Sequence, residues 1–205
     1  MFKHIAVLAL ACTATACATP EQNAALECGG GIAALSFVLC KVTGGDTGQC
    51  AAIGAGTGAL GGAACYGLAS HLDKRRAELA GKENDLNAQL EYIRGVNADS
   101  ERYNEQLRQS VVNVTKQTDT VVARIQQNQM TSEQIADAKR AIDRQVVDAR
   151  HQLDAQKRAW QEAKQFQLQH PNQSPELDAE IHKQEQILAA TQRGTQALAS
   201  QSQRF

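Results

Sequence analysis

Histidines, serines and carboxylates are the side chains here that most often perform catalysis, so their spacing decides whether an active site is expected. The sequence contains five histidines, His4, His71, His151, His170 and His182. No two of them are four positions apart, as two zinc ligands on one helix face would be, and HExxH does not occur. No serine has the G-x-S-x-G context of a nucleophile elbow. The carboxylates alternate with basic residues, as on a solvated helix face. We therefore predict no catalytic residue and no metal site.

One Gly-rich stretch contains a pattern that is typical of nucleotide binding. Gly56, Gly58 and Gly61 form G-x-G-x-x-G. In dinucleotide-binding proteins this pattern follows a strand and opens a helix within a parallel sheet. The sequence after Ser70 has a helical pattern throughout, so no such sheet is expected, and the stretch lacks the lysine of a P-loop. We therefore expect no nucleotide, no other cofactor and no small-molecule substrate.

The composition favours helices with narrow contact seams over a large globular core. Of the 205 residues, 42% are hydrophobic but only 4% are aromatic. Much of the apolar content is alanine, which buries little area per residue. The 21 basic and 22 acidic residues are interleaved and give a net charge of -1. Because the sequence contains no block of consecutive basic residues that could bind successive phosphates, nucleic acid is not an expected partner.

Residues 1–16 have the pattern of an export signal. Lys3 provides the positive start, and residues 5–11 form a short apolar region. Ala14 and Ala16 make an A-x-A site for ordinary secretory cleavage. The same residues, followed by Cys17, resemble the lipobox of bacterial lipoproteins, in which the cysteine becomes the acylated N-terminus. Ala14 stands where leucine is commoner, and Cys12 is a second candidate that leaves a shorter apolar region.

The number of cysteines helps to choose between the two kinds of cleavage. Of the 6 cysteines, Cys12 lies in the signal and Cys17 would carry the lipid, which leaves Cys28, Cys40, Cys50 and Cys65. An even number suits a disulfide framework in an exported chain, whereas ordinary cleavage before Cys17 leaves an odd thiol. We therefore favour palmitate-type acylation of Cys17. Ala18 is not Asp, which by resemblance to enteric sorting rules favours the outer membrane.

Two apolar segments, residues 29–42 and 50–69, are joined by residues 43–49, which are rich in turn formers. This arrangement predicts a helical hairpin. The second segment contains Gly54, Gly58 and Gly62, whose spacing of four places them on one helix face, where another backbone can approach closely. The second segment is long enough for a bilayer but the first is too short, so an interfacial, partly inserted or protein-packed hairpin is expected.

The cysteines fit this hairpin as nested pairs. If the turn centres near Gly45, Cys40 and Cys50 flank it, and Cys28 lies nearly opposite Cys65. We therefore predict the disulfides Cys40–Cys50 and Cys28–Cys65. Zinc is the competing interpretation, but the four residues contain no C-x-x-C pair.

The acylated cysteine followed by Gly54, Gly58 and Gly62 resembles the glycine-zipper family of bacterial envelope lipoproteins, over residues 17 to about 80. That resemblance implies membrane association or tight helix packing, and it implies no catalytic activity.

From Leu72 the sequence becomes polar and periodic. Apolar residues recur every seven positions with one polar interruption, at Leu72, Leu79, Leu86, Ile93, Ser100, Leu107, Val114 and Val121. This heptad pattern predicts one long helix to about Asn128. Thr131 with Gln134 predicts the capped start of a second helix, which ends before Pro171. Ser174 and Pro175 predict the start of a third, which fades around Gly194.

Together these features predict an all-α chain with four parts. Residues 1–16 are a signal, 17–27 a tether, 28–70 the Gly-rich hairpin, and 71–205 an elongated antiparallel hairpin or three-helix bundle with coiled-coil character. We expect a non-catalytic envelope lipoprotein that acts as a scaffold and contacts membrane lipid, itself or an envelope complex. One alternative is a glycine-zipper oligomer that permeabilises a membrane or forms part of a secretion channel. Another is a soluble periplasmic chaperone with coiled-coil arms.

Overall fold

The structure, a computed structural model, describes residues 40–41, 46–48, 50, 67–171 and 174–205. Its described elements are four helices: α3 (Leu68–Leu79), α4 (Leu86–Gln126), α5 (Ser132–Gln169) and α6 (Pro175–Ser202). The described part of the chain contains no strand, which confirms the all-α prediction at that level. The predicted Gly-rich hairpin falls almost entirely outside the described residues.

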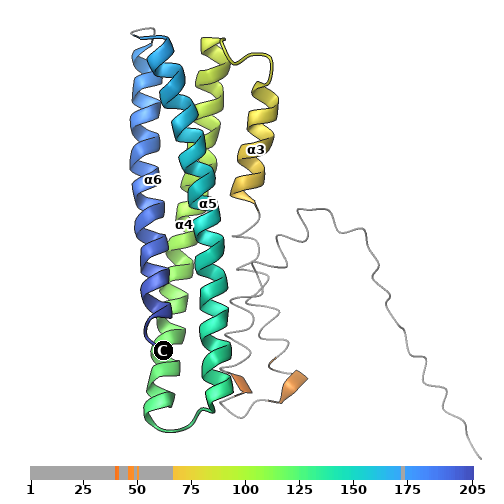
Figure 1. Cartoon of the computed structure of the whole chain (residues 1–205), viewed down its shortest axis with the longest axis vertical. Coiled ribbons are helices and arrows are strands. Elements are labelled where there is room, and N and C mark those ends of the chain that lie inside the picture. Colours follow the sequence, from red (N-terminus) through yellow and green to blue (C-terminus); the bar gives the residue numbers. More distant parts are fainter. Residues whose placement is uncertain (1–39, 42–45, 49, 51–66, 172–173) are drawn as a thin grey trace, which may run out of the picture.

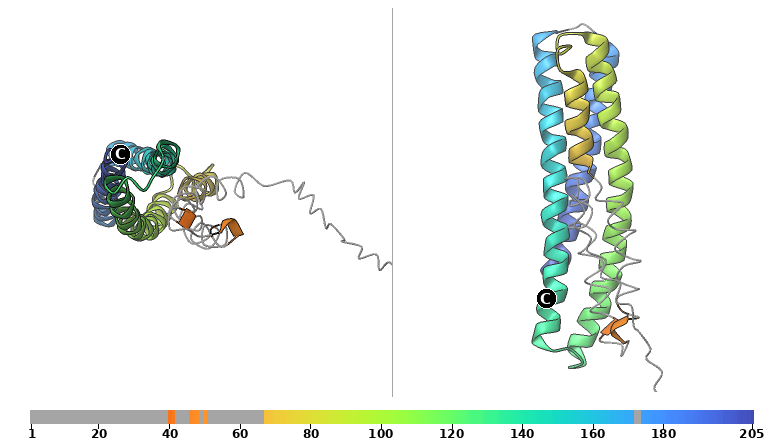
Figure 2. Two further views of the ribbon diagram at one scale, coloured as in Figure 1. Left: turned by 90° about the horizontal axis from the view of Figure 1, so that it is seen from below. Right: turned by 90° about the vertical axis from the view of Figure 1, so that its right-hand side faces the viewer.

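The three long helices pack side by side as a rod (Figure 1). α5 runs back along α4, and α6 turns again, so that α6 is parallel to α4. With 28 residues against the 41 of α4, α6 ends before the turn that joins α4 to α5. Figure 2 shows α3 between α4 and α5, with α6 behind it. Among the described helices, α3 therefore lies beside the rod only towards the end where α4 begins.

A continuous heptad seam holds the long helices together. In α4 the seam positions alternate in spacings of four and three and are buried or half-buried, at Leu86, Leu90, Ile93, Asn97, Ser100, Asn104, Leu107, Val111, Val114, Thr118, Val121 and Ile125. α6 has the same spacing, at Leu177, Ile181, Gln184, Leu188, Thr191, Thr195, Leu198 and Ser202. On α5 the seam contains mainly alanine and glutamine. Small side chains allow close helix packing but bury little area, so each helix depends on the other two.

The prediction of one unbroken helix from Leu72 to about Asn128 was wrong. α3 ends at Leu79, Gly81 adopts a left-handed backbone with φ of 81°, and α4 begins at Leu86. Asp85 caps the new helix by accepting a hydrogen bond from the backbone N–H of Ala88 at 2.9 Å. The heptad spacing from Leu79 to Leu86 crosses this break, so periodicity could not reveal it.

The other helix boundaries were predicted better. Thr131 and Gln134 form the predicted capping box, α5 ends before Pro171, and Ser174 caps a helix that starts with Pro175. The prediction that the last helix fades around Gly194 was wrong, since α6 continues to Ser202.

Cys40 and Cys50 are joined by a disulfide with a Cα–Cα distance of 5.3 Å, as the nested pairing predicts. The other predicted pair, Cys28–Cys65, lies outside the described residues, and so do Cys17, Gly54, Gly58 and Gly62.

A polar layer interrupts the apolar seam near the middle of the bundle. The Thr191 hydroxyl of α6 lies 2.6 Å from Asn104 Oδ1 on α4, 2.8 Å from Gln156 Oε1 on α5 and 3.2 Å from the Ile187 carbonyl. A hydroxyl has one proton, so it donates a hydrogen bond to one of these oxygens at a time. Asn104 Nδ2 also donates to the Ile187 carbonyl at 2.9 Å. One side chain thus links all three long helices.

Replacing this hydroxyl by a methyl group tests how much the layer contributes. We expect Thr191→Val to destabilise the fold by about 1–3 kcal/mol, because Asn104 and Gln156 are left with unsatisfied buried groups. Urea unfolding followed by circular dichroism at neutral pH measures this loss.

Thr118→Val is the matched control. Thr118 is also fully buried, but its hydroxyl has no hydrogen-bond partner in the described part of the chain. The same substitution there removes no hydrogen bond, so stability should stay within about 0.5 kcal/mol or rise. Equal losses in the two variants would show that the Thr191 layer has no special role.

Candidate functional site

Most residues predicted to act as sites cannot be placed. Cys17, the predicted lipid attachment point, and the three helix-packing glycines fall outside the described residues, and of the cysteines only Cys40 and Cys50 are described. A site on the described part of the chain must therefore lie on the helical bundle, where sequence reasoning singled out no functional residue.

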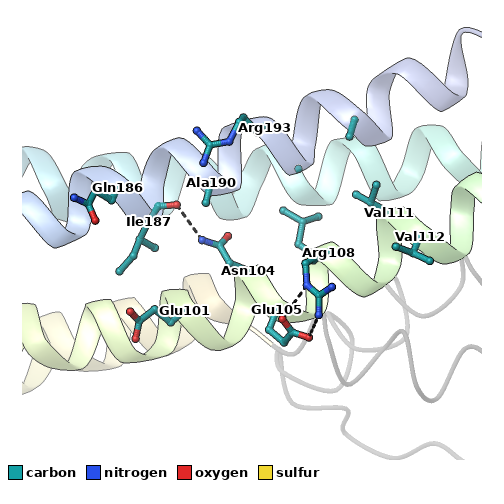
Figure 3. A pocket seen from close by; sticks show the side chains of 13 residues that line it. Glu101, Asn104, Glu105, Arg108, Val111, Val112, Gln186, Ile187, Ala190 and Arg193 are labelled. Carbon is teal, nitrogen blue, oxygen red and sulfur yellow. Dashed lines mark hydrogen bonds and ion pairs between the residues drawn. The ribbon is translucent and has the colours of Figure 1, made fainter.

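A groove with a volume of about 620 Å³ lies between α4 and α6 (Figure 3). α4 lines it with Glu101, Asn104, Glu105, Leu107, Arg108, Val111 and Val112, and α6 with Gln186, Ile187, Ala190, Arg193, Gly194 and Ala197. α5 passes behind these two helices in the same view. The groove therefore opens on the side of the bundle opposite α5.

The groove is shaped by small residues on α6. A Cβ atom added to Gly194 would lie 2.6 Å from Leu107 Cδ2 and 2.9 Å from its Cγ. Leu107 is itself buried, so it cannot easily move aside. Gly194 is therefore required for the close approach of α6 to α4, although sequence analysis took it as the sign of a fading helix.

The rim of the groove is charged, and its cations are not all neutralised. Lys183 pairs with Glu101 at 3.0 Å, and Arg108 with Glu105 of its own helix at 2.6 Å. Arg193 has no ion pair within the described residues. Beside the rim, Val112 is 44% exposed. The groove thus combines an apolar floor with the guanidinium of Arg193 at its edge.

A second notable region joins α3 to the rod through a buried carboxylate. Asp99 of α4, with a side chain only 6% exposed, accepts a hydrogen bond from Arg75 of α3 at 2.5 Å and also pairs with Arg102. Burial alone would raise the pKa of Asp99, but the hydrogen bond and charge of Arg75, helped by Arg102 and His71, hold it below its ordinary value. The ion pair thus fixes α3 against α4.

The other side of α3 is bound to α5 in a similar way. Arg76 pairs with Glu162 of α5 at 3.0 Å, and the Tyr92 hydroxyl of α4 donates to the same carboxylate at 3.2 Å. Burial and the neighbouring Glu162 charge raise the pKa of Tyr92, so its hydroxyl remains a donor. Leu68, Leu72 and Leu79 of α3 are buried in the hydrophobic core. α3 is thereby the helix that connects the N-terminal part of the chain to the rod.

One polar cluster lies at the last turn of α6. Lys139 Nζ lies 2.8 Å from Ser202 Oγ and 3.0 Å from the Ser202 carbonyl, and the Ser202 hydroxyl donates to Asp143. Lys139 is 44% exposed and also pairs with Asp143 at 3.6 Å. The cluster therefore caps the last turn of α6.

Within the residues that the structure describes, no helix combines the length and apolar character needed to cross a bilayer, and no three potential metal ligands lie together. No protein-family model, no curated protein and no solved structure matches this chain.

The lowered pKa of Asp99 predicts that acid weakens the attachment of α3. A carboxylate whose pKa is lower in the folded state than in the unfolded chain adds stability above about pH 4. That stability is lost as the pH falls through the folded-state pKa. We therefore expect Asp99→Asn to unfold more readily than the wild type at neutral pH, and this difference to shrink towards about pH 3. Urea unfolding across this pH range measures it.

Asp154→Asn provides the control, because Asp154 is an exposed carboxylate on α5 whose partner Lys157 lies on the same helix at 3.4 Å. Surface pairs of this kind contribute little, so its pH profile should match that of the wild type. Parallel profiles for Asp99→Asn and the wild type would mean that Asp99 does not stabilise α3.

Proposed function

We propose that this protein is a non-catalytic lipoprotein of the bacterial cell envelope. Acylated Cys17 and the Gly-rich hairpin hold one end of the chain at the outer membrane. The helical bundle extends from there on the periplasmic side as a scaffold that contacts an envelope complex or a second copy of itself.

The observation that carries this proposal is the form of the described helices. α4 has 41 residues, which at 1.5 Å per residue gives a rod about 60 Å long. The side chains of the seam fill the interior of the rod, so other molecules can contact only its outer surface. A rigid rod joined through α3 to an N-terminal segment with a lipobox-like sequence fits a tethered spacer or scaffold.

The groove between α4 and α6 supports the same proposal by offering a contact surface. Its apolar floor and the free charge of Arg193 suit an amphipathic helix, which would bury Val112 and bring a carboxylate to the guanidinium. Such a contact requires no chemistry from the groove residues.

Metabolic labelling tests the anchoring step. In a bacterial host grown with labelled palmitate, the wild-type chain should incorporate label and fractionate with membranes, because Cys17 becomes the acylated N-terminus. Cys17→Ser should lose the label and most of its membrane association.

Cys12→Ser is the matched control and should keep the label, since Cys12 lies within the signal. Globomycin, which blocks lipoprotein signal cleavage, should cause the precursor to accumulate. An unlabelled cytosolic form that retains residues 1–16 would contradict the proposal. An unlabelled soluble form in the periplasm would favour the chaperone alternative instead.

A further inference from the structure

The outward side of α5 carries several exposed basic side chains. Arg144, His151 and Arg158 recur every seven residues along it, and Arg150 lies beside them. All four side chains are exposed. Because the seam repeats every seven residues as well, these side chains stay on one side of the rod along its length. We refer to Arg144, Arg150, His151 and Arg158 as the basic face of α5.

The arginines of the basic face are not neutralised within the described part of the chain. Arg144, Arg150 and Arg158 have no ion pair there, whereas arginines of α3 and α4 such as Arg76 and Arg94 do. Carboxylates also lie near them: Asp154 pairs with Lys157 at 3.4 Å, and Asp148 accepts a hydrogen bond from the neutral amide of Gln152 at 3.2 Å. The face therefore presents unpaired guanidinium groups in a chain whose net charge is close to zero.

The same side of α5 has two strongly exposed aliphatic side chains. Val147 is 65% exposed and Leu168 is 76% exposed, the highest values among the large apolar side chains of the described residues. They are three heptads apart, so both lie on the outward side of the helix, one among the arginines and one beyond them. At 1.5 Å per residue they are about 32 Å apart along the rod.

We propose that the basic face of α5 binds the phosphate headgroups of anionic phospholipids, so that the rod lies along a membrane surface. A guanidinium group can donate two parallel hydrogen bonds to the oxygens of one phosphate. Because these arginines have no ion pair within the described residues, no carboxylate has to be displaced before a phosphate binds. Val147 and Leu168 then enter the boundary between headgroups and acyl chains, where apolar side chains are stabilised. Nucleic acid also has phosphates, but it offers no apolar environment for these two side chains. An acidic protein would need carboxylates placed in a straight line along the length of the basic face.

This orientation has a consequence for the groove between α4 and α6. The groove opens on the side opposite α5 (Figure 3), so a rod that lies on the membrane through α5 turns the groove away from the lipid. One side of the bundle would then contact the membrane while the other remains open to a partner. The inference extends the proposed membrane association, but the surface itself does not require an acyl group.

Vesicle binding tests the inference on the full chain with Cys17→Ser, which removes the lipid anchor. We expect cosedimentation with vesicles of phosphatidylglycerol and phosphatidylcholine, and much weaker cosedimentation with phosphatidylcholine alone. Adding the three substitutions Arg144→Gln, Arg150→Gln and Arg158→Gln should weaken binding to the anionic vesicles by about 100-fold, at about fivefold for each arginine near an anionic surface. Circular dichroism confirms that the variant remains helical.

The matched control changes the net charge equally on the other helices, through Lys74→Gln, Arg94→Gln and Lys116→Gln. It should bind anionic vesicles nearly as the parent does. Equal losses in both variants would show that total charge matters rather than the basic face, and would overturn the inference. So would equal binding to both kinds of vesicle, or an α5 variant that binds lipid normally but loses crosslinks to an envelope protein. Palmitate labelling of Cys17 should be unaffected by the α5 substitutions, so failure here is distinct from failure of the proposed anchor.

Discussion

The contact that the rest of the structure depends on is the hydroxyl of Thr191, where α6 meets Asn104 of α4 and Gln156 of α5. On α5 the seam is built largely from alanine and glutamine, which hold helices close together but distinguish poorly between one heptad and the next. A buried polar group that is satisfied in only one alignment makes the others costly. On this account the apolar side chains of the seam stabilise the packed helices. The Thr191 layer determines which heptads of the three helices lie side by side.

A fixed register determines what the surfaces can do. It places Gly194 against Leu107, which shapes the groove between α4 and α6, and it leaves the outward side of α5 free of any other described helix. It also aligns Asp99 and Glu162 so that both can bind arginines of α3. The proposed lipid-facing side of α5 and the groove proposed to face a partner are thereby held in one arrangement, as the proposed scaffold role requires.

Sequence reasoning predicted the features that local rules determine. The heptads of α4, the Thr131 capping box and the Ser174–Pro175 start are all present because they depend on spacing and on one or two side chains. The break before Leu86 was missed because the heptad continues across it, although Gly81 and Asp85 were usable signals. Gly194 was misjudged because its role depends on Leu107, 87 positions away in the sequence. The groove and the unpaired arginines of α5 were not found either, since both depend on which helices pack together.

The most direct test of the account is a spin-label distance between position 186 on α6 and position 116 on α4. In the wild type we expect one narrow distance distribution. When Asn104→Leu, Gln156→Leu and Thr191→Val remove the polar layer together, a second population should appear, shifted along the axis by one heptad or about 10 Å. A single distance identical to that of the wild type would contradict the claim that the Thr191 layer sets the register.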